Sequence, residues 1–427
     1  MPLILIAYLI FFFGAINLAR MAMFMIGSDL YTVKQARERK KYASHTIVPR
    51  FAVIIPAHNE KTTVLLAIKS SLAGSYPWEK LQVIVVDDGS TDETPEIISQ
   101  YIQDHPRYPV TLIRQQNSGK ANALNRGIRA AKDAELIMCL DADSALTTTA
   151  LEHASRYFFD PAVVALSANV KIIPRSGLLN MIQVFEYLIC YQMKRAESLF
   201  NFEYIIGGIG STFRRDILEK VGYYDTDTVT EDIDLTMKIV KLGNKKHKIE
   251  YGTNVVVYTE SVLSIQALIK QRFRWKWGRC QTFWKNRNLF FSTDPAFTRS
   301  LTWFYLPFAL YGDIAYFFEP LLLMYILFAS VRFHDPLPLL SAFVTISFYV
   351  MLNIWAEDTL SWRQKIVMCC LAPTMYIFFY ILSYVEYSAL LKTIVDLPQL
   401  TNSLTENNCG WVHVERPSEK TSLAPST

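Results

Sequence analysis

The sequence predicts an α/β domain on a doubly wound, mostly parallel sheet, joined to helices that cross a membrane. Three observations predict this. Short apolar runs alternate with amphipathic stretches over residues 51–144, which is typical of βαβ units. Two of those runs end in clustered acids, as expected where ligands bind at the carboxyl ends of parallel strands. Long apolar stretches precede and follow this part of the chain.

The alternating part can be assigned element by element. It comprises strands in FAVIIPAHNE (51–60), LQVIVVDDGS (81–90), 111–114 and ELIMCLDADS (135–144), and helices at 62–72 and 122–131. No Gly-x-Gly-x-x-Gly or Gly-Lys-Ser/Thr loop occurs, which argues against a Rossmann dehydrogenase or a P-loop enzyme. Any nucleotide must therefore be held in another way.

Composition favours membrane association. The chain has 427 residues, 51% of them hydrophobic and 13% aromatic, with a net charge of +4. That charge is too small to indicate a nucleic-acid partner. The six cysteines show no CxxC spacing, so we expect reduced thiols and neither disulfides nor zinc ligands.

The apolar stretches predict a multi-pass protein of the plasma membrane. Residues 3–26 are long enough to span a bilayer as one helix, and no Lys or Arg precedes them as in a signal peptide. Basic residues follow, which places the next domain in the cytoplasm. Three more spans are expected at 301–331, with its helix starting near Ile314, at 337–356 and at 366–391. Acids inside these spans are expected to be buried in the bundle or in a polar path, namely Asp313, Glu319 and Glu386.

The expected organisation has six segments. They are an N-terminal transmembrane helix (1–26), a basic linker (27–50), a catalytic domain (51–260), amphipathic interfacial helices (261–300), a C-terminal transmembrane bundle (301–392) and a polar tail (393–427).

Acids and one lysine mark a candidate site at the strand ends. Asp141 and Asp143 are separated by one residue. Two carboxylates in this arrangement can hold a hard cation, and phosphate oxygens can complete its coordination shell. Asp87 and Asp88 lie at the neighbouring strand end, and Lys120 on the intervening loop could meet a phosphate. One Asp-x-Asp alone is weak evidence, but two acidic strand ends in one sheet are harder to dismiss.

Glu231 and Asp232 open a predicted helix through Leu242. In a purely structural interpretation Thr230 caps that helix and the two acids favour the positive end of its dipole. In a functional interpretation a carboxylate at a helix start facing a cleft acts as a general base. The Gly207–Ser211 turn nearby could let backbone approach a substrate closely.

The segment 261–293 carries seven Lys or Arg and no acid, interleaved with aromatic residues. Its centre is Gln271-Arg272-Phe273-Arg274-Trp275. Three interpretations compete: an amphipathic helix on an anionic leaflet, a nucleic-acid surface, or a site where Arg274 clamps a diphosphate and Trp275 offers a stacking face.

Together the motifs resemble the processive, membrane-embedded family-two glycosyltransferases, which include cellulose, chitin, hyaluronan and poly-N-acetylglucosamine synthases. Five motifs occur in the family's order, over residues 51–289: VVDDGS at 85–90, GKANALN at 119–125, DAD at 141–143, TED at 230–232 and QRFRW at 271–275. The size, the single N-terminal span and VTEDIDLTMKI look most like bacterial poly-β-1,6-N-acetylglucosamine synthases. GWVHVER at 410–416 is similar to a tail of related enzymes, which would be cytoplasmic, whereas the predicted span count puts it outside.

The resemblance implies a GT-A type mixed sheet and a role for each motif residue. Asp87 and Asp88 would contact uridine, Lys120 the diphosphate and Asp141 the nucleotide, and Asp143 would bind Mg²⁺ or Mn²⁺. Asp232 would be the base, beside Glu231. Gln271 and Arg274 would hold the donor, and Trp275 would stack on the acceptor sugar. The implied partners are a UDP-sugar, the growing polysaccharide, the lipid bilayer and a small membrane accessory subunit, with no nucleic acid.

The implied activity is processive, inverting β-polymerisation of N-acetylglucosamine from UDP-N-acetylglucosamine, with export of the chain. Three alternatives stay open. The enzyme could add a single sugar to a lipid or other acceptor, or it could make another β-glycan such as a glucan, chitin or hyaluronan. A non-catalytic adaptor that binds anionic lipid or nucleic acid would explain the basic segment but not the acids.

Overall fold

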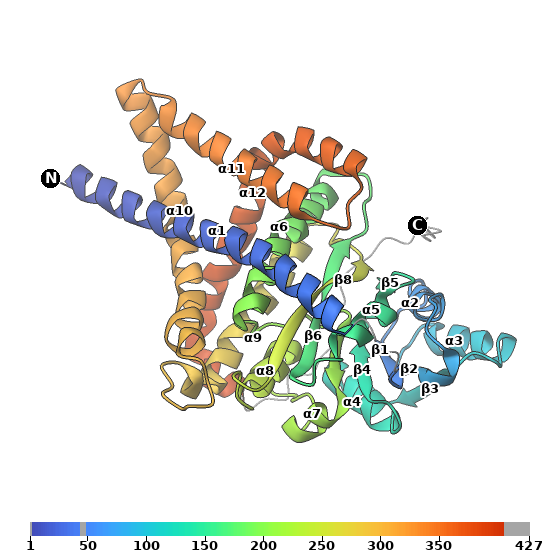
Figure 1. Ribbon diagram of the computed structural model, residues 1–427. Coiled ribbons are helices and arrows are strands. Elements are labelled where there is room, and N and C mark those ends of the chain that lie inside the picture. The colour runs from blue at the N-terminus through green and yellow to red at the C-terminus, as the bar shows by residue number, and fades with distance from the viewer. Residues whose placement is uncertain (1, 43–47, 405–427) are drawn as a thin grey trace.

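The computed structural model describes residues 2–42 and 48–404, and its centre is an eight-stranded mixed sheet (Figure 1). The strand order is β3-β2-β1-β4-β7-β6-β8-β5. The strands are β1 (Phe51–Ala57), β2 (Leu81–Asp88), β3 (Val110–Gln115), β4 (Leu136–Cys139), β5 (Ala145–Leu146), β6 (Val163–Ile172), β7 (Ser211–Arg214) and β8 (Lys248–Thr259).

Helices flank the sheet and form a separate group at one end of the molecule. Those of the sheet domain are α2 (Val64–Leu72), α3 (Thr94–Asp104), α4 (Lys120–Ala130), α5 (Ala150–Tyr157), α6 (Leu178–Phe200), α7 (Arg215–Val221), α8 (Glu231–Val240) and α9 (Ile265–Lys285). The others are α1 (Pro2–Lys41), α10 (Leu306–Phe333), α11 (Leu337–Ala356), α12 (Trp362–Asp396) and the short α13 (Leu400–Ser403). Short 3₁₀ turns lie at Trp78–Lys80, Arg287–Leu289 and Leu397–Gln399, and a π-helical turn at Ser300–Tyr305.

The first four strands in spatial order, β3, β2, β1 and β4, are parallel, as the alternating sequence predicts. Every residue of β1 is buried, because helices cover both faces of this part of the sheet. Helix α4 lies so close that a Cβ on Gly127 would be 2.4 Å from Cγ2 of Ile54. This packing brings the carboxyl ends of β1, β2 and β4 to one edge.

The other half of the sheet is mixed. β7 is antiparallel to both β4 and β6, β5 is antiparallel to β8, and only β6 and β8 run parallel. The mostly parallel sheet expected from the alternation is therefore wrong for this half, whereas the mixed sheet implied by the resemblance is confirmed. Periodicity does not report strand direction, because a buried strand shows the same apolar run either way.

Helix α1 continues well past the predicted span at 3–26. It runs to Lys41, so the first part of the expected linker at 27–50 is helical. The buried Tyr31 hydroxyl donates to the Tyr251 carbonyl oxygen at 2.6 Å, and Lys34 lies 2.5 Å from Glu250 of β8. Those contacts with the sheet domain stabilise the helical extension beyond its apolar part.

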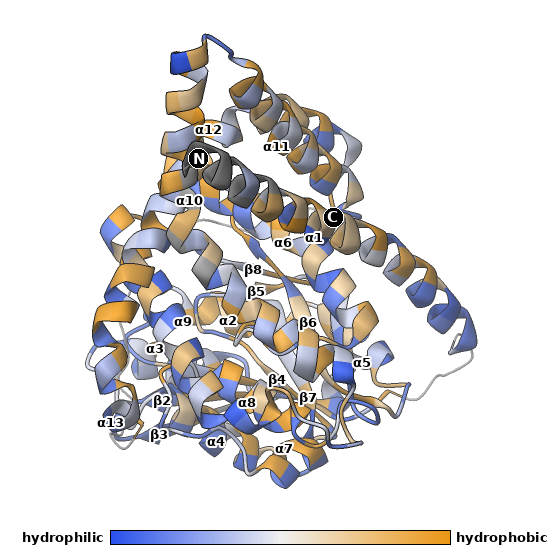
Figure 2. Ribbon diagram, turned by 90° about the vertical axis from the view of Figure 1, so that its left-hand side faces the viewer, coloured by the Kyte–Doolittle hydropathy of each residue, from blue (hydrophilic) through white to orange (hydrophobic). Residues whose placement is uncertain are grey.

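The C-terminal helices gather on one side of the sheet, away from β2 and β3 (Figure 2). Within the described residues, two helices are long and apolar enough to cross a membrane: Leu337–Ala356 and Trp362–Ser403. The helix expected to start near Ile314 starts instead at Leu306, directly after the π-helical turn, and Pro320 lies inside it. The number of membrane spans stays a prediction.

Both ends of α12 contact the sheet domain. At the α11–α12 turn, Glu357 lies 3.4 Å from Lys171 of β6, and Arg195 of α6 donates to the Ala356 carbonyl at 3.3 Å. Beyond the other end of α12, Gln281 of α9 donates to the Ser403 hydroxyl at 2.9 Å. The α10–α11 turn lies at the far end of the helical group (Figure 1).

Candidate active site

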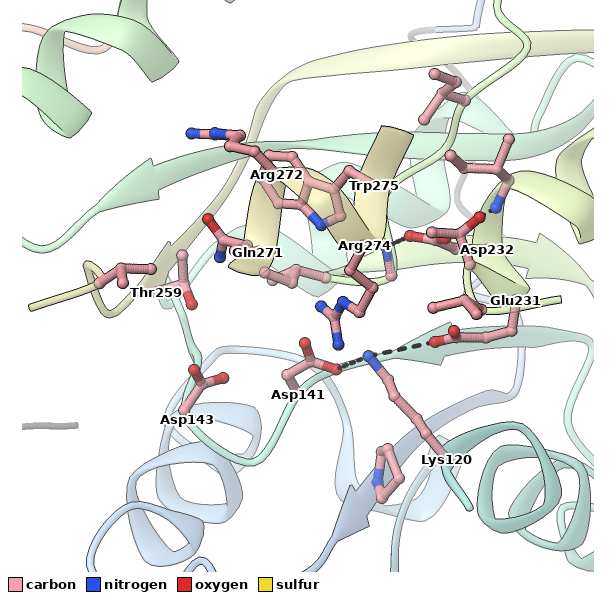
Figure 3. Close-up of a pocket in the computed structure, with 18 of the residues that line it drawn as sticks. Lys120, Asp141, Asp143, Glu231, Asp232, Thr259, Gln271, Arg272, Arg274 and Trp275 are labelled. Carbon is pink, nitrogen blue, oxygen red and sulfur yellow. Dashed lines mark hydrogen bonds and ion pairs between the residues drawn. The ribbon is translucent and has the colours of Figure 1, made fainter. Parts of the chain in front are cut away.

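A cavity of about 480 Å³ opens between the strand ends, the start of α8 and one face of α9 (Figure 3). Elements far apart in the sequence supply its walls. The residues expected from sequence that line it are Lys120, Asp141, Asp143, Glu231, Asp232, Gln271, Arg274 and Trp275.

Lys120 joins two of the acidic motifs. It is the first residue of α4, and its Nζ lies 2.7 Å from Asp141 Oδ1 and 3.5 Å from Glu231 Oε1. Burial lowers the pKa of Lys120, but the two carboxylates outweigh that effect and raise the pKa above its ordinary value. The ammonium therefore stays charged inside the cavity, as a phosphate-binding group must.

Asp232 is held by backbone amides and is unusually basic. Its Oδ2 accepts from Gly208 N at 2.9 Å and its Oδ1 accepts from Ile233 N at 2.8 Å. Burial, followed by the neighbouring Glu231 charge, raises the pKa of Asp232 from 3.8 to about 6, although Lys120 and Arg274 oppose the rise. A carboxylate of this kind is a stronger proton acceptor than an exposed aspartate and is still ionised at neutral pH.

Thr230 precedes α8, but its side chain makes no cap hydrogen bond. Its hydroxyl oxygen is buried without a hydrogen-bond partner in the described residues. Thr230 is instead pressed against α9, where a Cβ on Gly278 would lie 2.3 Å from Thr230 Oγ1. The capping interpretation therefore does not explain this threonine, whose contacts fix the distance between α8 and α9.

Asp141 and Asp143 follow β4 and both face the cavity (Figure 3). Asp143 is 5% exposed and accepts from the Ser144 hydroxyl at 3.0 Å. Carboxylate oxygens are the ligands that Mg²⁺ and Mn²⁺ prefer, and two such groups leave most of an octahedral shell for phosphate and water. The donor set therefore fits a divalent cation held jointly by the protein and a diphosphate.

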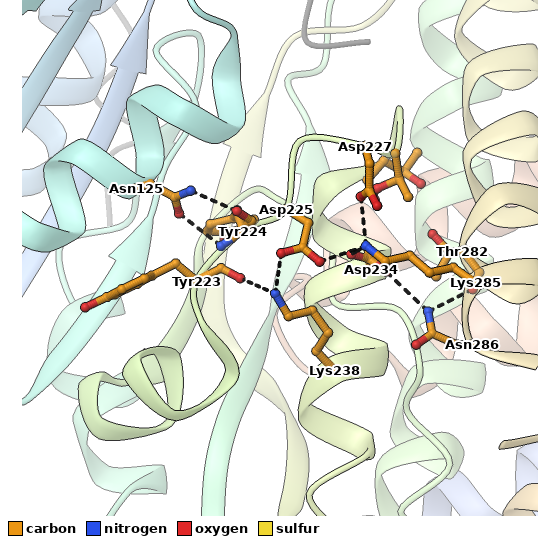
Figure 4. A network of polar contacts seen from close by, with 12 residues as sticks. Asn125, Tyr223, Tyr224, Asp225, Asp227, Asp234, Lys238, Thr282, Lys285 and Asn286 are labelled. Atoms are coloured by element: carbon orange, nitrogen blue, oxygen red, sulfur yellow. Dashed lines mark hydrogen bonds and ion pairs between the residues drawn. The ribbon is translucent and has the colours of Figure 1, made fainter. Parts of the chain in front are cut away.

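A second acidic group lies outside the cavity and is paired with lysines. Asp225, Asp227 and Asp234 converge on the Lys285 ammonium of α9, at 2.7, 2.8 and 2.9 Å (Figure 4). Asp225 also contacts Lys238 at 2.6 Å. This cluster ties the loop before α8 to α9, and the lysine occupies the centre that a metal ion would need.

Asp87 and Asp88 are not among the residues that line the cavity. The buried Asp88 carboxylate accepts from Gly119 N at 2.8 Å, Ser118 N at 3.0 Å and Gln115 Nε2 at 2.6 Å. It thereby shapes the loop that leads into Lys120. Asp87 accepts from Ser90 N at 3.2 Å. The expected contact of both aspartates with uridine stays a prediction.

Helix α9 supplies the opposite wall. Gln271, Arg274 and Trp275 face the cavity, and the Arg274 guanidinium points into it (Figure 3). Within residues 2–42 and 48–404, no carboxylate lies within ion-pairing distance of Arg274. A cation in that position can meet an anionic ligand without first breaking an internal pair.

The cavity also contains residues that were not expected from sequence as side chains of the site, although the Gly207–Ser211 turn and Glu386 had been noted for other reasons. His58 follows β1, and its Nδ1 lies 2.9 Å from the Asp88 carbonyl oxygen; its place after the first strand was a usable signal, although no histidine was expected near the site. Gly208 lies in the glycine turn, where its amide holds Asp232. Tyr187 and Glu386 come from helices α6 and α12, and no motif marks them.

Comparisons with known proteins agree with this geometry. Residues 52–222 match the sequence model of glycosyl transferase family 2. The chain is 35% identical over 238 residues to a poly-beta-1,6-N-acetyl-D-glucosamine synthase of Staphylococcus epidermidis, covering 55% of this chain and 56% of that protein. It is 33% identical over 242 residues to the synthase of the same name from Staphylococcus aureus strain COL, covering 56% of each.

The alignments therefore span just over half the length of these curated relatives. Among solved structures, a mannosyltransferase from Pyrobaculum calidifontis in complex with GDP-Man and Mn²⁺ is similar in fold, with a TM-score of 0.53 and 21% identity. The match covers 88% of this chain and 98% of that one. The fold is a GT-A glycosyltransferase fold.

Proposed function

We propose that this chain, which carries a glycosyl transferase family 2 domain, polymerises N-acetylglucosamine from UDP-N-acetylglucosamine into a β-1,6-linked glycan at a membrane. The observation that carries the proposal is one cavity holding a basic carboxylate, Asp232, beside the Lys120–Asp141 pair and opposite Arg274 and Trp275. Such a cavity offers a proton acceptor, cations for a diphosphate and an aromatic face for a sugar.

The chemical step is an in-line displacement. Asp232 takes the proton of the acceptor hydroxyl, and that oxygen forms a bond to C1 of the donor sugar as the bond from C1 to the diphosphate oxygen breaks. The electron pair of the broken bond leaves with UDP, and an α-linked donor becomes a β-glycoside. Lys120 and Arg274 stabilise the charge that develops on the diphosphate.

Asp143, with Asp141 beside it, would hold Mg²⁺ or Mn²⁺, the second of which is bound in the mannosyltransferase of similar fold. A bound cation supplies further neutralisation of the leaving diphosphate. The protein's own part is to keep the two carboxylates at the strand end, where Lys120 balances Asp141.

We infer the membrane arrangement from the contacts between helix termini and the sheet domain. The α11–α12 turn and Ser403, near the end of the described residues, both contact it, whereas the α10–α11 turn lies at the far end of the helical group (Figure 1). We place the sheet domain, the α11–α12 turn and Ser403 on the cytoplasmic side, and His334 outside. In this arrangement α12 begins and ends on one side and does not cross the membrane, although it is long and apolar enough to do so. The tail is then cytoplasmic without a further span, and this arrangement replaces the span expected at 366–391.

Sidedness can be tested in whole cells with a membrane-impermeant maleimide. In a chain freed of its native cysteines, His334→Cys should be labelled, and Thr359→Cys and Thr401→Cys, all three at exposed positions, should react only after permeabilisation. Labelling of Thr401→Cys in intact cells would contradict the proposed return of α12.

The catalytic proposal is tested by UDP release from detergent-purified full-length protein with Mg²⁺ or Mn²⁺. UDP-N-acetylglucosamine and UDP-glucose are supplied separately, and products are sized and treated with linkage-specific hydrolases. A long product cut only by a β-1,6-hexosaminidase supports the proposal. A single addition, or turnover only with glucose, would leave the domain a glycosyltransferase with another product.

A further inference from the structure

Helix α9 is joined to α6, α10 and α12 by a chain of charges, which we call the seam network. Its members are Glu186, Arg272, Glu386, Lys276, Asp313 and Arg279. Three cations of α9 alternate with three carboxylates from the other helices, so the network carries no formal net charge. Asp313 and Glu386 were expected to be buried in the bundle or in a polar path; their side chains are 20% and 18% exposed and pair with cations of α9, whereas the side chain of Glu319 lies outside the described residues.

Arg272 connects this network to Trp275. Its side chain is only 5% exposed, and its guanidinium carbon lies 4.2 Å from the centre of the Trp275 ring. A guanidinium at this distance attracts the ring electrostatically and covers one of its faces. Because a ring has two faces, this stack leaves the other one for a ligand in the cavity.

Two carboxylates pair with Arg272. Glu186 accepts a hydrogen bond from Nη2 at 2.7 Å, whereas Glu386 lies 3.3 Å from Nε in an ion pair without a hydrogen bond. Glu386 also contacts Lys276, one helical turn further along α9, at 2.8 Å. Glu386, on helix α12, therefore contacts side chains on two consecutive turns of α9. It also lines the cavity.

We propose that Glu386 of α12 is a positioning residue for the acceptor: it holds Arg272 against Trp275, so that the ring presents its free face to the acceptor sugar. The role rests on the proposed glycosyl transfer. Acceptor binding then depends on the position of helix α12, whereas donor binding depends on Lys120 and Asp141 on the other side of the cavity. Loss of Glu386 should therefore affect acceptor affinity and product length, and not donor chemistry.

Asp313 provides a matched control. It belongs to the same network and carries the same charge, but it contacts Lys276 and Arg279 and is not paired with Arg272. If the network only docks membrane helices on α9, Glu386→Gln and Asp313→Asn should behave alike. If Glu386 positions Trp275, only the first should change the ring's environment.

The experiment combines a spectroscopic and a kinetic measurement on the full-length protein in detergent. Tryptophan is replaced by 5-fluorotryptophan, and the ¹⁹F resonance of Trp275 is assigned with Trp275→Phe. Glu386→Gln should move that resonance, shorten the product and raise the acceptor KM about three- to tenfold, the range expected for one weakened aromatic contact. The Kd for UDP, measured by calorimetry, should stay within about twofold of the wild type, the scale of a change that leaves donor contacts intact.

Arg272→Lys keeps the charge but removes the planar stack, and it should reproduce these effects if Glu386→Gln does not fold. An unmoved resonance in Glu386→Gln, or the same changes in Asp313→Asn, would overturn the positioning role. So would a moved resonance with unchanged acceptor KM. A wild type that releases no UDP would refute the proposed function, while the ¹⁹F comparison would still decide whether Glu386 sets the position of Trp275.

Discussion

Replacing Asp232 by Asn should stop transfer and at the same time change how stability depends on pH. The variant removes a proton acceptor that the structure places in the cavity, with hydrogen bonds from Gly208 N and Ile233 N. Loss of a positioned general base lowers rates by about 10²–10⁴-fold. UDP affinity should change little, because Lys120 and Arg274 remain.

The magnitude for stability follows from the raised pKa. Burial lifts the pKa of Asp232 from 3.8 to about 6, a rise of about two pH units, and each unit corresponds to about 1.4 kcal/mol. Above pH 6 the folded state bears a charge that it disfavours, whereas below about pH 3 both folded and unfolded states are protonated. Wild-type stability should therefore fall by about 3 kcal/mol between about pH 3 and pH 8 because of this group.

Asparagine has no such dependence. The stability of Asp232→Asn relative to the wild type should rise by about 3 kcal/mol over the same pH range, and any lost hydrogen bond adds only an offset that does not vary with pH. Thermal unfolding in detergent at several pH values measures the stability difference. UDP release and UDP affinity at pH 7.5 measure transfer and donor binding. Retained turnover would refute the base assignment, and a stability difference independent of pH would refute the burial argument.

Four further predictions follow from other contacts. Turnover of the wild type should decline as pH falls through about 6, because Asp232 becomes protonated; a decline only near pH 4 would point to an exposed carboxylate. Lys120→Met should weaken UDP binding, measured by calorimetry, about 10- to 100-fold, because a charge-assisted contact is lost. Lys285→Met should destabilise the fold by about 3 kcal/mol, since three carboxylates lose their shared partner; an unchanged melting temperature would contradict this. Gly278→Ala should reduce turnover while UDP affinity persists, because its Cβ would collide with Thr230 beside Glu231 and Asp232; full activity would show that α8 and α9 can separate freely.

The parallel half of the sheet and most of the site could be predicted from local patterns. A buried strand between helices needs a continuous apolar run, so β1, β2 and β4 were visible, and their polar ends marked Asp141 and Asp143. The resemblance then joined these motifs to Asp232 and Trp275, which the cavity brings together.

Other features depend on contacts between distant residues. The raised pKa of Asp232 requires burial and Glu231 together with the opposing Lys120 charge, and no single motif contains all of these. Asp88 ends a strand and Asp141 follows one, yet only Asp141 lines the cavity, while Asp88 accepts hydrogen bonds from the loop before Lys120. The sequence pattern alone does not distinguish these two positions, and the contact of Asp88 with uridine stays a prediction.

The sequence by itself determined the order of the strands and helices in the first half of the domain and the residue types of the site, because these depend on local periodicity and short motifs. Only the tertiary structure decided three other features: the antiparallel direction of β7, the contact between the end of α12 and the sheet domain, and the ion pair between Glu386 and Arg272. The physical reason is that each of these rests on pairing between segments far apart in the chain. Such pairing depends on packing and charge neutralisation between distant segments, so it cannot be predicted from the pattern of neighbouring residues.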